Sequence, residues 1–243
     1  MKTEATSKKH TSLMAAALCG DAQAQFKLAW RYEFAIGVKP CQREAMHWYR
    51  KAARQSHINA KFGLARCYRD SGDYRAAANW WHRAANEGDA ESQFDLGERF
   101  ELGDGVERNV AEAARWYLKA AQRGNRMAQF NLGVLYCTGK GVKKDRAKMA
   151  GWWRKAARQG HAESQFNLGV CYQVGDGVPK NRAMAIRYFQ LAAARPIYDP
   201  RFDLGRVFLC GDKEHAVRVA IAEQPNSLDD SRPEANSWAR LKT

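Results

Sequence analysis

Two stretches of the chain decide its fold: RMAQFNLGVLYCTGKGVKKDRAKMAGWWRKAARQG at residues 126–160 and AESQFNLGVCYQVGDGVPKNRAMAIRYFQLAAA at residues 162–194. Both hold the phrase QFNLG, then a glycine-rich turn, then a phrase rich in aromatic residues and alanine. The phenylalanine of the first phrase recurs at intervals of 36, 32, 36, 36 and 36 residues, at Phe26, Phe62, Phe94, Phe130, Phe166 and Phe202. A fixed period of this length indicates a stack of repeated structural units.

Each unit predicts two helices, which we name helix A and helix B. Helix A carries the phenylalanine phrase at helical spacing and ends at a glycine, such as Gly139. Helix B is expected to begin at an N-cap residue: Asp73, Asn109, Asp145 or Asn181. Glu112 follows Asn109 by three residues, which predicts a capping box.

The tryptophans of helix B recur in step with helix A and are predicted to pack between helices, at Trp48, Trp80, Trp116 and Trp152. Trp81 and Trp153 follow one residue later, about 100° around the helix, and are expected to be partly exposed.

The pattern predicts an all-α fold, a solenoid of about six helix-turn-helix repeats with a period of 36 residues. We expect the repeats near 22–56, 58–88, 90–124, 126–160 and 162–196, with a truncated capping repeat at 198–223. Repeat two is four residues short in the turn between its helices. An orphan helix B is expected at 11–19, so the solenoid spans 11–223 between a flexible N-terminus at 1–10 and a polar C-terminal tail at 224–243.

The composite A-x-x-Q-F-x-L-G-x-x-Y-x-x-G-x-G-V, then D or N, then W-x-x-K-A-A-x-x-G, resembles the Sel-one-like repeat, a relative of the tetratricopeptide repeat. Repeats three, four and five match it almost in full, whereas Ala35 replaces the first turn glycine in repeat one. The resemblance implies a right-handed α-superhelix that assembles other proteins, and it names no particular partner.

The composition predicts a soluble chain with an excess of positive charge. Its 243 residues are 45% hydrophobic, which is enough for a sizeable core. No apolar run approaches the roughly 20 residues that a membrane helix needs, so no membrane association is expected. The formal net charge of +14 favours a partner with an acidic portion.

The expected localisation is cytoplasmic. The six cysteines show no C-x-x-C pair and no fixed spacing, which favours reduced thiols. Lys8 and Lys9 precede a short apolar stretch that could instead be an export signal, so an exported effector or envelope adaptor stays open.

Motifs for catalysis, metals and cofactors do not occur in the sequence. The six histidines form no H-E-x-x-H motif and are expected to lie singly on the surface. The paired turn glycines lack the G-x-x-x-x-G-K-[ST] pattern of a phosphate-binding loop, and no S-x-x-K occurs. We therefore predict no enzymatic activity, no cofactor and no metal site.

The charge is concentrated in repeat four. Residues 125–160 hold nine Lys or Arg and one Asp, whereas residues 89–124 hold five basic and eight acidic residues. A tight group occupies the turn and the start of helix B, and we name it the basic patch: Lys140, Lys143, Lys144, Arg146 and Lys148. Such a patch could contact an acidic protein or nucleic-acid phosphates.

In superhelices of this kind helix A lines the concave side. Positions one, four and eight residues after each phenylalanine vary in chemistry, and they supply the predicted partner-binding residues: Lys27, Trp30, Phe34, Arg66, Asp95, Glu98, Asn131, Val134, Asn167, Val170 and Val174. The sequence thus predicts a non-enzymatic adaptor that binds a protein or peptide in this groove, assisted by the basic patch. The alternative is a nucleic-acid-associated protein.

Overall fold

The computed structural model describes residues 2–194, with side chains from residue 10 onward. These residues form eleven helices and no strand. In chain order the helices are α1 (Lys2–Leu18), α2 (Ala22–Glu33), α3 (Gln42–Arg54), α4 (Ile58–Asp70), α5 (Tyr74–Asn86), α6 (Ala90–Leu102), α7 (Val110–Gln122), α8 (Arg126–Thr138), α9 (Arg146–Arg158), α10 (Ala162–Val174) and α11 (Arg182–Ala193). The predicted capping repeat at 198–223 and the tail at 224–243 lie outside the described residues.

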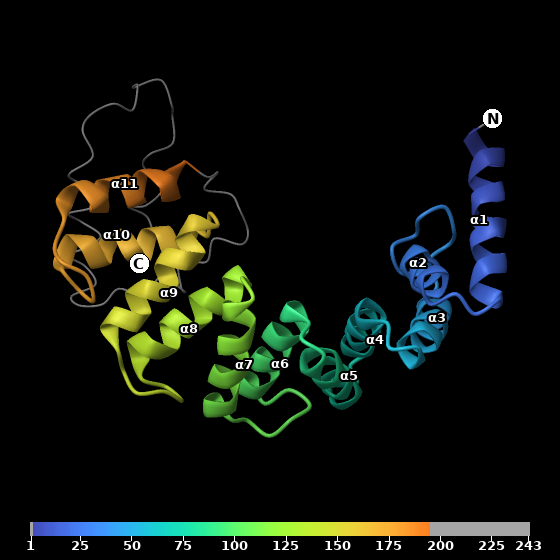
Figure 1. Ribbon diagram of the computed structural model, residues 1–243, viewed down its shortest axis with the longest axis horizontal. Helices are drawn as coiled ribbons and strands as arrows, with labels where there is room; N and C mark the ends of the chain where they lie inside the picture. Colours follow the sequence, from blue (N-terminus) through green and yellow to red (C-terminus); the bar gives the residue numbers. More distant parts are fainter. Residues whose placement is uncertain (1, 195–243) are drawn as a thin grey trace, which may run out of the picture.

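The helices follow one another along a curved arc, with α1 and α11 toward its two ends (Figure 1). Each helix packs against the one before it and the one after it, and α2 also contacts α4. Helices A are α2, α4, α6, α8 and α10, and helices B are α3, α5, α7, α9 and α11. This arrangement confirms the predicted all-α solenoid.

Helix α1 differs from the prediction in its length. It begins at Lys2, so residues 2–10, predicted as a flexible N-terminus, continue the orphan helix that was expected only from residue 11. None of the described helices is both long enough and apolar enough to span a membrane.

The glutamine of the repeated QF phrase ties each helix A to the helix B before it. The last four carbonyls of an α-helix have no partner within the helix. The buried Nε2 atoms donate to such carbonyls at 3.0–3.1 Å, from Gln25 to Ala17, Gln93 to Ala85, Gln129 to Ala121 and Gln165 to Ala157. Repeat two has Lys61 in this place, buried and paired with Glu87 instead.

The core between helices A and B is built on a glycine of helix A that faces an aromatic ring of helix B. A Cβ on Gly133 would lie 2.4 Å from the Trp153 ring. Gly97 faces Tyr117 and Gly169 faces Phe189 in the same way, each at 2.7 Å. The glycine therefore lets the ring approach the helix backbone without a gap, as close packing requires.

The prediction for Trp81 and Trp153 is wrong, because both are fully buried. Of the four tryptophans predicted to pack between helices, Trp48 and Trp116 are buried, and Trp80 and Trp152 are only half-buried. The face of helix B toward the core is thus centred one residue later than the repeated tryptophan suggests. On the outer side Lys155 lies over the Trp152 ring at 3.9 Å, a cation–π contact that covers the remaining indole face.

The predicted N-caps of helix B are confirmed. The side chains of Asp73, Asn109, Asp145 and Asn181 each accept a hydrogen bond from the backbone N–H three residues later. The capping box forms only in part, because the Glu112 carboxylate pairs with Arg115 at 2.9 Å. Two histidines predicted as lone surface residues are N-caps as well: His57 begins α4, and His161, which is buried, begins α10.

The turns between helices A and B also hold neighbouring repeats together. Gly141 has φ +70°, and a Cβ there would lie 2.5 Å from the carbonyl oxygen of Val110, the first residue of α7. Gly177 lies in the same way against the carbonyl of Arg146 at the start of α9, at 2.1 Å. Each such turn therefore packs on the N-terminus of the helix B in the repeat before it, and only glycine fits there.

Candidate partner-binding surface

The predicted partner-binding residues fall into three groups by exposure. Lys27, Trp30, Phe34 and Val174 are exposed, and Arg66, Asp95, Glu98, Asn131 and Val134 are half-buried. Asn167 and Val170 are buried, with exposed fractions of 0% and 1%, so the expectation that these two can contact a partner is wrong. Position in the repeat therefore does not fix exposure, because α10 is buried over more of its surface than the equivalent helices.

An aromatic pair forms the exposed surface of repeat one. Trp30 lies in the last turn of α2 and Phe34 is the C-cap residue of that helix, with ring centroids 5.4 Å from each other. The guanidinium of Arg66, on α4, lies 5.0 Å from the Phe34 ring centroid. The two rings thus stand on a surface that two repeats share.

Ion pairing fixes the position of Arg66. Its Nε and Nη2 atoms both donate to Oε1 of Glu33, at 2.9 and 2.5 Å, while Oε2 of Glu33 accepts a 2.6 Å bond from the Tyr49 hydroxyl. Burial, and next the hydrogen bond to Glu33, raise the pKa of Tyr49, so the phenol stays neutral at physiological pH. The aromatic pair therefore has a rigid support.

The central repeat presents carboxylates one and four residues after its phenylalanine, at Asp95 and Glu98. Burial, followed by the neighbouring Glu98 carboxylate, raises the pKa of Asp95 to about 7. Arg69 and Arg99 act in the opposite direction. The charge at this point of the surface consequently changes over the physiological pH range.

A stripe of exposed apolar side chains recurs eight residues after the repeat phenylalanine. Phe34, Leu102 and Val174 occupy this position in repeats one, three and five, with exposed fractions of 47%, 61% and 48%. Trp30, 45% exposed, adjoins Phe34. Together these four residues form what we call the apolar stripe. The repeat spacing counts Leu102 at this position, but it was not among the residues predicted to bind a partner.

The lysines of the basic patch are exposed, whereas its arginine makes contacts within the protein. Lys140, Lys143, Lys144 and Lys148 are exposed. Arg146 is half-buried. Its Nη1 atom lies 3.3 Å from a carboxylate oxygen of Asp176, in the turn between the two helices of repeat five, and 3.1 Å from the Cys137 sulfur. Arg146 therefore holds repeats four and five together, a role that no pattern in the sequence indicates.

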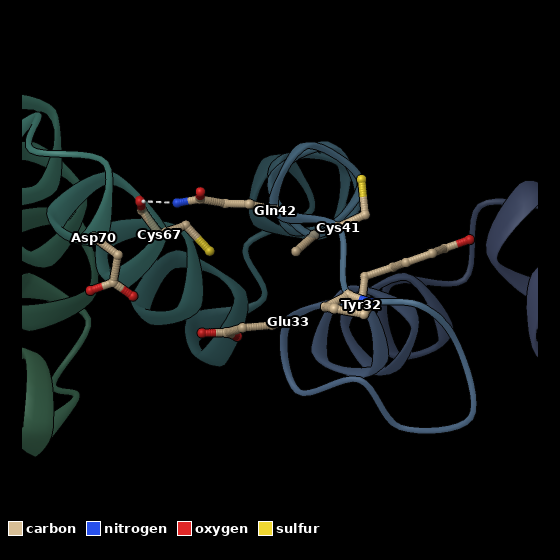
Figure 2. Close-up of a pocket in the computed structure, with 8 residues that line it drawn as sticks. Tyr32, Glu33, Cys41, Gln42, Cys67 and Asp70 are labelled. Atoms are coloured by element: carbon tan, nitrogen blue, oxygen red, sulfur yellow. Dashed lines mark hydrogen bonds between the residues drawn. The ribbon is translucent and has the colours of Figure 1, made fainter.

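A cavity of about 290 Å³ lies where repeats one and two meet (Figure 2). Its lining residues come from the end of α2, the start of α3 and the end of α4: Tyr32, Glu33, Pro40, Cys41, Gln42, Ala45, Cys67 and Asp70. Gln42 reaches across from α3, and its Nε2 donates to the Cys67 carbonyl oxygen at 3.0 Å. Burial, and next Glu33, raise the pKa of Cys67 to about 12, so this thiol is neutral.

The described residues contain no cluster of three or more His, Cys, Asp or Glu side chains placed to hold a metal ion. The described cysteines, Cys19, Cys41, Cys67, Cys137 and Cys171, are free thiols. Cys210 lies outside the described part of the chain.

Comparison with known proteins identifies the repeat. The profile described as Sel1 repeat matches residues 22–57, 58–89, 90–125, 126–161 and 162–196. Among solved structures, c5321, a protective antigen present in uropathogenic Escherichia coli strains and displaying an SLR fold, is 32% identical with a TM-score of 0.73. A Sel1 repeat protein from Oxalobacter formigenes is 31% identical with a TM-score of 0.71.

These matches cover 76% and 77% of this chain, but only 40% and 56% of the two related chains. No curated protein matches the sequence. Sel1 repeat proteins generally act as protein-interaction scaffolds, and the repeat is a non-catalytic scaffold fold. Because five repeats match over residues 22–196, the chain belongs to the Sel1 repeat family.

Proposed function

We propose that this protein is a non-enzymatic scaffold that binds a segment of a partner protein along the helix A side of the solenoid. The apolar stripe carries the proposal. In a solenoid, equivalent positions of successive repeats lie in line, so Phe34, Leu102 and Val174 belong to one row with Trp30 at its N-terminal end. The exposed polar residues Asp70 and Thr138 of repeats two and four lie between them in this row. We take the recurrence of large exposed apolar side chains in every second repeat to mark the interaction surface.

The aromatic end of the stripe is the expected energetic centre. Aromatic residues on a fixed support often supply most of the binding energy of an interface. Glu33 already neutralises Arg66 and holds it beside Phe34. A partner side chain can therefore cover the two rings without leaving an unpaired charge behind. The half-buried carboxylates Asp95 and Glu98 then favour a polar or cationic group further along the same segment.

Matched substitutions test the stripe. We expect Trp30→Ala to weaken partner binding at least about tenfold, because it removes the larger ring of the anchor. Tyr74→Ala is the control, since Tyr74 is an aromatic residue of nearly equal exposure, 43% against 45%, outside the stripe. Leu102→Ala and Leu18→Ala, at 61% and 66% exposure, form a second pair.

The measurement is quantitative capture from native lysate with each variant, followed by titration of the recovered partner. The proposal requires that the stripe variants lose the partner and the control variants keep it. Equal binding by all four variants would exclude the apolar stripe as the docking surface.

A second candidate function rests on the lysines of the basic patch. We infer that Lys140, Lys143 and Lys144, all exposed and close together in one turn, could bind nucleic-acid phosphates. Binding of a labelled oligonucleotide is then expected to fall steeply between low and high salt and to vanish in the double variant Lys143→Glu, Lys144→Glu. Binding that survives both changes would remove this candidate, as would capture of the same protein partner after nuclease treatment.

A further inference from the structure

Three turns of this chain pack on equivalent surfaces, each at the N-terminus of a helix B. In repeats three, four and five the second turn glycine lies against the first residue of the helix B in the repeat before it. A Cβ on Gly105, Gly141 or Gly177 would lie 2.1, 2.5 or 2.1 Å from a carbonyl oxygen there. The N-terminus of each of these B helices therefore accommodates the backbone of a turn only where that turn has a glycine.

The N-terminus of α3 is the equivalent surface in repeat one, and no turn of the described chain packs on it. The turn that would do so belongs to repeat two, in which only Ser71, Gly72 and Asp73 separate α4 from α5. Repeats three and four have seven residues there, at 103–109 and 139–145. The cavity of about 290 Å³ lies at this point, bordered by Gln42, the first residue of α3.

Helix α3 begins at the N-cap residue Cys41, which has the same extended backbone as Asp145, another N-cap that follows a long turn of its own repeat. Unlike Asp145, Cys41 makes no side-chain hydrogen bond to the helix. The first turn of α3 thus has no side-chain cap of its own.

The size of the cavity limits its occupant. Its volume is several times the roughly 30 Å³ that one water molecule takes up in the liquid, so a short piece of chain fits. The two carboxylates of the lining, Glu33 and Asp70, are paired with Arg66 and Arg69, which lie outside the lining. The shape of the cavity therefore selects its occupant more than its charge does.

We propose that the cavity at the start of α3 is a docking site for a glycine-containing turn of a partner protein. The partner's turn takes the place that the chain's own G-x-G turns take on α5, α7 and α9. Its second glycine lies against the Gln42 carbonyl, where a larger residue would clash. This site shares no residue with the apolar stripe, although Glu33, which lines the cavity, also holds Arg66 beside Phe34.

A cyclic peptide that contains GKGVKK, the sequence of residues 139–144, is the probe. With the full-length ¹⁵N-labelled protein, we expect saturable shifts of the Gln42 and Arg43 amide signals. The matched peptide GKAVKK is expected to produce none, because its alanine places a methyl group where the chain's own turns have only glycine.

A protein variant supplies the reciprocal control. Replacing Ser71 and Gly72 by GKGVKK restores a full-length turn in repeat two, which is expected to fill the cavity and abolish the shifts. If that variant does not fold, Asp70→Arg changes an exposed lining residue and opposes a cationic turn by charge. Leu18→Ala, an exposed residue outside both the cavity and the apolar stripe, is expected to leave peptide binding unchanged.

Shifts of equal size with both peptides would overturn the proposal, and so would shifts that persist in the restored or Asp70→Arg variant. Absence of any shift with GKGVKK at millimolar concentration would also overturn it. Because the probe does not touch the apolar stripe, each of these results leaves the scaffold function to its own test.

Discussion

Replacing Trp153 by alanine is expected to lower the free energy of unfolding by about 3–5 kcal/mol. The indole is fully buried, it fills the space above Gly133, and its Nε1 donates to the Phe130 carbonyl at 3.2 Å. Alanine would leave a cavity between α8 and α9 that the glycine cannot fill. Urea unfolding followed by circular dichroism measures the change.

The neighbouring Trp152 is the matched control for this substitution. It is half-buried and lies beneath Lys155 on the outer side of α9. Trp152→Ala is expected to cost only about 1–2 kcal/mol, from partial burial and the lost cation–π contact. If Trp152→Ala proved the more damaging of the two, the assignment of the core-facing side of helix B would be wrong.

The second large effect is expected at Gly141, which we predict to cost about 3 kcal/mol when changed to alanine. An L-residue in the left-handed region costs roughly 1–2 kcal/mol, and the new methyl group would also push against the Val110 carbonyl, 2.5 Å away. To relieve this clash, the turn of repeat four has to move away from α7. Thermal and urea unfolding measure the loss.

A substitution at Gly139, two residues earlier in the same turn, distinguishes the cost of backbone strain from the cost of the clash. It has φ +76°, but its added Cβ would meet nothing closer than 3.4 Å. Gly139→Ala is therefore expected to cost only the backbone strain, about 1–2 kcal/mol. Equal losses for the two variants would mean that the contact between turn and helix contributes nothing to stability.

Most of the fold could be predicted from the sequence because the repeats are local and similar. The phenylalanine period located the helix pairs, and glycines and N-cap residues such as Asn109 and Asp145 marked the turns. Each of these signals depends only on residues that are close to one another in the sequence. The start of α1 had no such signal in the repeat register, and there the prediction was wrong.

The contacts between repeats were harder to predict. The tryptophan repeat located helix B but not its buried side, because Trp81 and Trp153 differ from Trp80 and Trp152 only by one step of rotation. The role of the QF glutamine depends on a carbonyl eight residues earlier, which becomes its partner only when two helices pack.

The candidate site was predicted in part for the same reason. Lys27 and Trp30 are exposed as expected, whereas Asn167 and Val170, at the equivalent positions of repeat five, are buried. The short turn of repeat two was visible in the sequence. That it leaves a cavity became clear only from the contact that Gly141 makes with the repeat before it.

Hydroxyl-radical footprinting of the protein, free and with its captured partner, tests the proposed docking surface most directly. In the free protein, Trp30, Phe34 and Leu102 are predicted to be oxidised quickly, and the buried Trp81 and Trp153 slowly. On binding, the stripe residues are predicted to become protected while Tyr74 and Leu18 keep their reactivity. Protection of Tyr74 and Leu18 with no change at Trp30, Phe34 and Leu102 would contradict the account.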